Sequence, residues 1–175
     1  MIKKIFLTLG LLILAWLLYA ATKPSTFAVQ RSVTIKAPVE KVYTLVDSLR
    51  AWSAWSPYEH LDSQMTKTYA GPPSGVGASW SWESKKAGSG RMTIIAAKPT
   101  TSITFALDFM APMAAHDTAE FTFVPRGDSV AVTWGIHGPN PYAMKVVSTL
   151  MNVDAIYASD FDRGLASLKA LAEKP

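Results

Sequence analysis

The sequence contains no cysteine, and this absence removes several kinds of chemistry at once. Disulfide bonds, thiolate metal sites and cysteine nucleophiles are all excluded. Histidine is scarce as well, since His60, His116 and His137 lie far apart and no two have the spacing of paired metal ligands. We therefore predict no metal site and no cofactor.

An excess of charge of one sign is also missing from most of the chain. The formal net charge is +4, but Lys3 and Lys4 precede a long apolar run, and the other residues carry 15 basic and 13 acidic side chains. Such a nearly neutral domain lacks the basic surface on which nucleic-acid binding depends. We therefore expect no nucleic-acid partner.

Familiar catalytic motifs do not occur either. The sequence has no Gly-x-Ser-x-Gly, His-Glu-x-x-His or phosphate-binding loop. Gly75-Val76-Gly77 lacks the third glycine of a dinucleotide-binding loop, and Arg126-Gly127-Asp128 is ordinary turn chemistry between two strands. Glu59 and His60 follow an aromatic stretch and are acid–base candidates, but a solvated loop is the favoured interpretation for both. We predict no catalytic residue.

What the sequence does have, near its start, is an uncharged apolar run from Ile5 to Ala21. A helix over this run is about 26 Å long, at the short end of what crosses a bilayer core. A cleaved signal peptide is the alternative. Cleavage of a signal peptide requires small residues at positions −3 and −1. Each possible cleavage point here has Leu18, Tyr19 or Thr22 at one of these positions, so an uncleaved anchor is favoured.

The charges that flank this run predict the topology. Lys3 and Lys4 favour a cytoplasmic N-terminus. We therefore expect a single-pass membrane protein, with a transmembrane anchor at 1–23 and one domain at 24–175 on the extracytoplasmic (periplasmic) side. The sequence does not predict an oligomeric state.

The rest of the chain begins with a strand and short helices and continues as strands. Thr26–Lys36 is rich in β-branched residues and predicts a strand, and a helix over Val39–Asp47 follows Pro38. In Ala78–Glu83, tryptophan alternates with serine, as in a strand with one buried face. Leu49–Leu61 is interpreted as short helical turns. Further strands are predicted at Met65–Tyr69, at Arg91–Ala97 and around Phe105, Phe121 and Val132.

A helical pattern fills the remainder. Apolar residues recur at spacings of three and four from Met144 to Leu168, with a break expected near Asn152. The apolar face of the strands and the apolar face of this helix are both buried if the helix packs on the sheet. The sequence therefore predicts an α+β fold: a curved antiparallel sheet of about seven strands wrapped around a long C-terminal helix, preceded by one transmembrane helix.

This order of elements, together with several short motifs, resembles the helix-grip fold of the START-like superfamily. The motifs include Ala37–Val42, Trp52–Tyr58, Gly88–Ile94 and Asp160–Leu165. More narrowly, the chain is similar to membrane-anchored members of the SRPBCC group of the polyketide cyclase/dehydrase type, over about Phe27 to Ala172. Tyr58 stands where relatives often carry tryptophan. The resemblance implies an apolar cavity between sheet and helix, but it implies no particular reaction.

Aromatic and methionine side chains are therefore the candidate ligand-binding residues. They are Trp52, Trp55, Trp80, Trp82, Phe105, Phe109, Phe121, Phe123, Trp134, Met144, Met151 and Phe161. The favoured function is membrane-tethered binding of a lipid or other small hydrophobic molecule. Two alternatives stay open: a cyclase, dehydratase or hydrolase that uses the same cavity, and a structural interaction protein of the envelope whose aromatic side chains fill the core.

Overall fold

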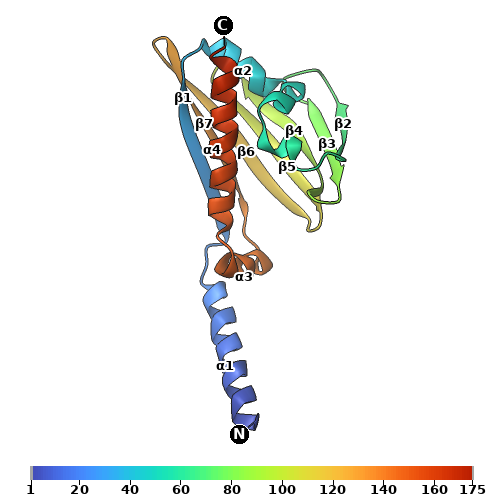
Figure 1. Cartoon of the computed structure of the whole chain (residues 1–175), viewed down its shortest axis with the longest axis vertical. Coiled ribbons are helices and arrows are strands. Elements are labelled where there is room, and N and C mark those ends of the chain that lie inside the picture. The colour runs from blue at the N-terminus through green and yellow to red at the C-terminus, as the bar shows by residue number, and fades with distance from the viewer. Residues whose placement is uncertain (1, 175) are drawn as a thin grey trace.

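The computed structural model describes residues 2–174, apart from the side chain of His60. A long helix, α1, projects from one end of a domain in which helix α4 runs along a curved sheet (Figure 1). The helices are α1 (Ile2–Ala21), α2 (Val39–Asp47), α3 (Tyr142–Leu150) and α4 (Val153–Ala172), with two 3₁₀ turns, η1 (Leu49–Ala54) and η2 (Pro57–His60). The strands are β1 (Thr26–Ile35), β2 (Thr66–Ala70), β3 (Ser79–Ser84), β4 (Gly88–Lys98), β5 (Ser102–Ala111), β6 (Ala115–Arg126) and β7 (Ser129–Pro139).

The seven strands form one antiparallel sheet in the order β1-β7-β6-β5-β4-β3-β2. Consecutive strands from β2 to β7 are neighbours, as in a meander, and β1 joins the outer edge of β7, with Val33 opposite Val132. The predicted curved seven-stranded sheet with a long C-terminal helix is therefore confirmed.

Alternation along each strand decides which side chains face the helix. In β7, Val130, Val132, Trp134 and Ile136 are buried, while the residues between them are partly exposed. Glu120 of β6 lies on the outer face, as its parity predicts. One face of the sheet is thus apolar and needs a cover.

Helix α4 supplies this cover. The Asn152 side chain accepts a hydrogen bond from the Ala155 backbone N–H at 3.0 Å and caps the first turn. Phe161, Leu165 and Leu168 then point into the core and are almost fully buried. The predicted break near Asn152 is confirmed.

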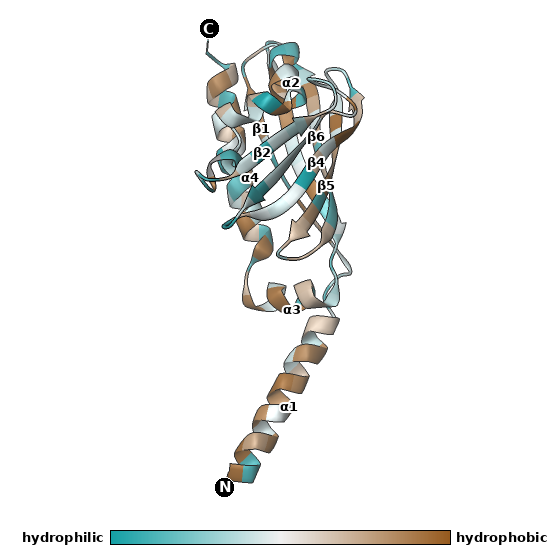
Figure 2. Cartoon of the chain, turned by 90° about the vertical axis from the view of Figure 1, so that its right-hand side faces the viewer, coloured by the Kyte–Doolittle hydropathy of each residue, from teal (hydrophilic) through white to brown (hydrophobic). Residues whose placement is uncertain are grey.

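Helix α3 differs from the prediction that the whole stripe packs on the sheet. None of its residues is buried, and it lies between the end of α1 and the base of the domain (Figures 1 and 2). The backbone is extended at Met151 and is not helical at Asn152, so the chain changes direction there. The apolar face of α3 is therefore not part of the domain core.

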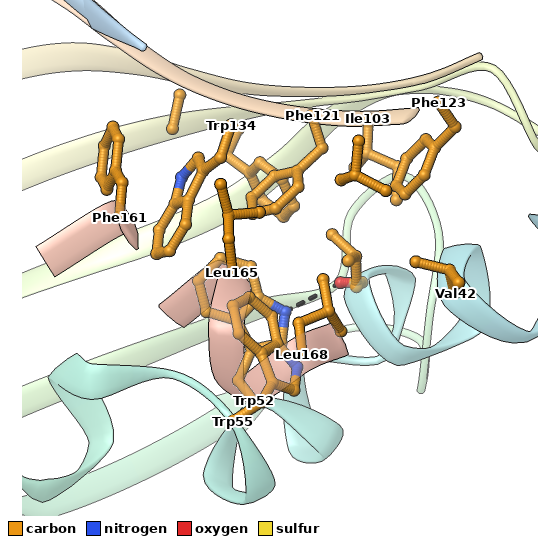
Figure 3. Packing of buried hydrophobic residues seen from close by; sticks show 14 of the residues in the cluster. Val42, Trp52, Trp55, Ile103, Phe121, Phe123, Trp134, Phe161, Leu165 and Leu168 are labelled. Carbon is orange, nitrogen blue, oxygen red and sulfur yellow. Dashed lines mark hydrogen bonds between the residues drawn. The ribbon is translucent and has the colours of Figure 1, made fainter. Parts of the chain in front are cut away.

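Stacked aromatic rings fill much of the interior between the sheet and α4 (Figure 3). The Trp134 ring lies 4.2 Å from Phe161 and 4.9 Å from Phe121, measured between centroids. The indole N–H groups of Trp52 and Trp55 are satisfied by the carbonyls of Val46, at 2.8 Å, and Leu45, at 3.0 Å. Trp52 and Trp55 are therefore buried without an unsatisfied indole donor.

Candidate functional site

A cavity of about 240 Å³ remains in the half of the interior nearer to α3. It lies between the first half of α4, the turn after η1 and strands β3 to β7. Its lining residues are Trp52, Tyr58, Leu61, Met65, Trp80, Trp82, Ala87, Met92, Leu107, Phe109, Ala119, Trp134, Ile136, Tyr157 and Phe161. Every one of these is apolar or aromatic, so the cavity favours apolar contents.

Small residues leave this space open. On β6, Ala119 occupies the inward position two residues before Phe121, so one wall lacks a large side chain. On β4, Gly90 lies opposite Trp82, and a Cβ atom at Gly90 would come within 2.5 Å of the Trp82 ring. The glycine lets that ring lie flat against the sheet and form a wall of the cavity.

Two polar atoms in this apolar wall have no partner among the described residues. They are the Tyr58 hydroxyl and the Trp80 indole Nε1, and both are buried. Burial, with a smaller contribution from Asp160, raises the pKa of Tyr58 far above its ordinary value. Both groups are therefore present as neutral hydrogen-bond donors, and a ligand acceptor atom within reach of either would recover the cost of leaving that donor unpaired.

Glu59 corrects the prediction of a solvated loop. Its side chain is only 1% exposed and forms an ion pair with Lys67 of β2. The Lys67 ammonium also donates to the Glu59 carbonyl at 3.2 Å and lies 5.8 Å from the Trp80 ring centroid. Glu59 is buried where η2 carries it against Lys67, and no local sequence pattern shows this contact. The side chain of His60 lies outside the described part of the chain.

Asp117 is a buried acid that the motif search missed. It is 8% exposed and shares its inward direction on β6 with Ala119, Phe121 and Phe123. Burial raises its pKa, and its charge contributes to the raised pKa of Tyr157. Parity along β6 was the available signal, because Asp117 is two residues before Ala119.

The structure divides the twelve predicted ligand-binding residues into three groups. Trp52, Trp80, Trp82, Phe109, Trp134 and Phe161 line the cavity. Trp55, Phe105, Phe121 and Phe123 are buried in the packed core beside it. Met144 and Met151 lie outside the interior because α3 turns away from the sheet.

Several cavity residues were not among the predicted twelve. Tyr58, Leu61, Met65, Met92, Leu107, Ile136 and Tyr157 come together only through the tertiary fold. Within residues 2–174, no three histidine or acidic side chains gather as a possible metal site.

Comparisons with known proteins agree with this architecture. The di-domain aromatase/cyclase BexL from the BE-7585A biosynthetic pathway has a TM-score of 0.65 at 17% identity, over 90% of this chain and 54% of its own. Protein CV1439 from Chromobacterium violaceum has a TM-score of 0.60 at 17% identity, over 87% of this chain and 100% of its own. An Aha1 protein from Colwellia psychrerythraea has a TM-score of 0.57 at 14% identity, over 84% of this chain and 96% of its own. At these identities the likeness concerns the fold alone.

No curated protein sequence is a significant match to the chain. The model of the polyketide cyclase / dehydrase and lipid transport family, by contrast, matches residues 26–173, which is the whole domain after α1. On this match the chain belongs to the polyketide cyclase / dehydrase and lipid transport family.

Proposed function

We propose that the domain binds a small apolar molecule with one hydrogen-bond acceptor, in the cavity between the sheet and α4. The observation that carries this proposal is an apolar wall in which the buried donors of Tyr58 and Trp80 have no partner among the described side chains. An unpaired buried donor costs about 1–3 kcal/mol, which a ligand carbonyl, carboxyl or hydroxyl oxygen would recover. Family membership supports the same function.

The size of the cavity narrows the class of ligand. Its 240 Å³ is slightly below the roughly 300–1,000 Å³ of pockets that hold drug-sized molecules. A single acyl chain or a small ring system fits this space better than a large fused-ring molecule. The proposed ligand class is therefore fatty acids and similarly slender lipids.

A membrane tether completes the proposal. Among the described residues, α1 is the one helix that is long and apolar enough to cross a membrane. Figure 2 shows that apolar residues occupy nearly its whole length. We assign residues 1–23 as the anchor and 24–175 as the binding domain, on the periplasmic side. This placement would bring the cavity close to a supply of lipid.

The direct test is to purify the full-length protein in detergent, extract it with organic solvent and analyse the extract by mass spectrometry. A reproducible fatty acid or lipid, bound in near-stoichiometric amount, is expected. Ala119→Leu fills the cavity and should abolish this signal. The matched control, Ala106→Leu, adds the same side chain on the outer face of β5 and should retain it.

Two results together would contradict the proposal: the wild type carries no bound ligand, and added decanoic acid does not quench its tryptophan fluorescence. That result would favour the interaction protein with a filled core. Tyr58→Phe tests the polar contact. It should keep the fold and weaken decanoic acid binding about tenfold, the equivalent of 1.4 kcal/mol.

A cyclase or dehydratase is the second candidate function. The observation in its favour is again Tyr58, because a hydroxyl with a strongly raised pKa stays protonated and can donate to an oxygen on which negative charge develops. If the domain is an enzyme, Tyr58→Phe would abolish turnover of an enolisable carbonyl substrate while substrate binding persists. If Tyr58→Phe loses binding and the wild type shows no turnover, the enzyme is excluded and the binding function remains.

A further inference from the structure

Helix α3 is held against the last turns of α1 by two specific contacts. The Trp16 indole N–H donates to the Thr149 hydroxyl at 2.8 Å, and the Tyr142 hydroxyl donates to the Leu17 carbonyl at 2.9 Å. Ala20 is fully buried, although the rest of α1 is largely exposed. The position of α3 relative to the proposed membrane span is therefore defined.

The length of α1 sets the depth of α3. From Lys4 to Lys23 a helix rises about 29 Å, which only just matches the roughly 30 Å hydrocarbon core. If α1 spans that core, Trp16 and Ala20 lie within about 10 Å of its upper boundary. Helix α3 packs on these residues, so it lies at the boundary between acyl chains and headgroups and not in bulk water.

The surface of α3 suits that position. Leu150 is 70% exposed and Tyr142 is 49% exposed, and beside α3 the linker residue Met151 and Ile156 in the first turn of α4 are also about half exposed. Lys145 is the single charged residue between Pro139 and Val153. Figures 1 and 2 show α3 lying across the direction of α1, which is the orientation of a helix that rests on a membrane surface.

A second apolar element lies at the same end of the domain. The turn between β5 and β6 exposes Met110 and Met113 and has no charged residue from Met110 to Ala115. The register places the start of β6 beside the end of β7, and β7 leads directly into α3. We define the α3-end surface as Met110, Met113, Tyr142, Leu150, Met151 and Ile156.

We propose that the α3-end surface docks into the headgroup region of the lipid bilayer and points the mouth of the cavity at the membrane. This inference rests on the proposed membrane span. The cavity residues Phe109, Tyr157 and Ala87 are partly exposed and come from the ends of β5, α4 and the β3–β4 turn nearest to this surface. A slender lipid would then pass from the bilayer to the cavity without crossing bulk water.

The absence of native cysteine makes the test direct. Leu150→Cys, Leu12→Cys and Val124→Cys are prepared singly in the full chain, labelled with the fluorophore NBD and reconstituted into phosphatidylcholine–phosphatidylglycerol vesicles. Lipids with a nitroxide near the top of the acyl chain test the label at Leu150, and lipids with a nitroxide near the end of the acyl chain test the label at Leu12, which lies near the middle of the proposed span. Val124 is the matched control, since it is 52% exposed and lies at the opposite end of the sheet, near the β6–β7 turn.

The expected result is strong quenching of the label at Leu150, with blue-shifted emission, and none at Val124. Quenching at Leu12 without quenching at Leu150 would leave the membrane span standing and overturn the docked surface. A blue shift at Leu150 without quenching by the lipid would mean that protein covers α3, and this result also overturns the docking proposal. If Leu12 is not quenched, the span itself fails and the docking proposal fails with it.

Discussion

The two halves of the space between the sheet and α4 are built differently. Far from α3, the second half of α4 meets the sheet through Leu165 and Leu168, and α2 closes the side. Phe105 and Phe121 project from the sheet there and leave no space. Nearer to α3, the sheet offers Ala119 and Gly90, and the cavity lies above them. We call these the filled half and the hollow half.

The contrast shows that one sheet can serve two purposes. The filled half buries Phe105 and Phe121 completely, and that burial stabilises the fold. The hollow half gives up part of that stabilisation and retains a cavity beside two buried donors that no described residue pairs. Mutations should therefore affect stability mainly in the filled half and ligand binding mainly in the hollow half.

The largest effect is expected from truncating a ring in each half. Phe121→Ala should lower the free energy of unfolding by about 3–5 kcal/mol, because Phe121 is fully buried. Phe109→Ala should cost less than about 2 kcal/mol, because Phe109 is partly exposed beside existing empty space. Urea denaturation measures both, and equal losses would contradict the division into two halves.

The next effect concerns the ion pair behind the Trp80 wall. Lys67→Met leaves the Glu59 carboxylate buried without its partner and should cost up to about 3 kcal/mol, less than for a fully buried pair because Lys67 is partly exposed. The double variant Glu59→Leu with Lys67→Met should recover most of the loss. Thermal unfolding of the three proteins tests this, and a double variant as unstable as the single one would refute it.

A smaller effect is expected at the junction of the halves. A Cβ atom at Gly164 would lie 2.7 Å from the Trp134 ring and 3.0 Å from Pro57. Gly164→Ala should therefore destabilise by about 1–3 kcal/mol, although the same change at an exposed helical site stabilises. Ser167→Ala on the exposed face of α4 is the control and should change little. The sign of the Gly164 effect, measured by urea denaturation, decides whether α4 approaches the sheet this closely.

The smallest effect is a pH dependence at the edge of the hollow half. Burial raises the pKa of Asp117 in the folded state above its unfolded value of about 4. Folding is therefore favoured when Asp117 is protonated, and this contribution is lost as the pH rises through the folded pKa. Asp117→Asn should melt at a higher temperature than the wild type at pH 8, with a smaller difference near pH 4. An unchanged difference across that range would contradict burial as the cause.

Sequence patterns predicted much of this protein because they act locally. Alternating residues such as Val130, Val132 and Trp134 identified the strands. Pro38 marked the start of α2, and Asn152 marked the break before α4. These signals depend on the backbone period and on neighbouring residues only. The order of the elements was predicted for this reason, and the resemblance to the helix-grip fold rested on that order together with the short motifs.

The site was predicted less well, since a cavity is defined by what is missing between distant segments. Trp80 and Phe121 are both aromatic and inward-facing, yet Trp80 lines the cavity and Phe121 is packed in the core. Nothing in their local sequence distinguishes them. The twelve aromatic and methionine residues therefore included both wall and core.

The sequence by itself determined the elements, their order and the apolar character of α1, because these follow from local periodicity and composition. The tertiary structure decided which aromatics enclose a cavity, that Glu59 is buried against Lys67, and that α3 leaves the sheet and packs on α1. The α3 contacts join residues 133 and 125 positions apart in the chain, and the Glu59–Lys67 contact joins a 3₁₀ turn to a strand. Local periodicity does not specify such contacts, because they form only when separate elements come together in the tertiary fold.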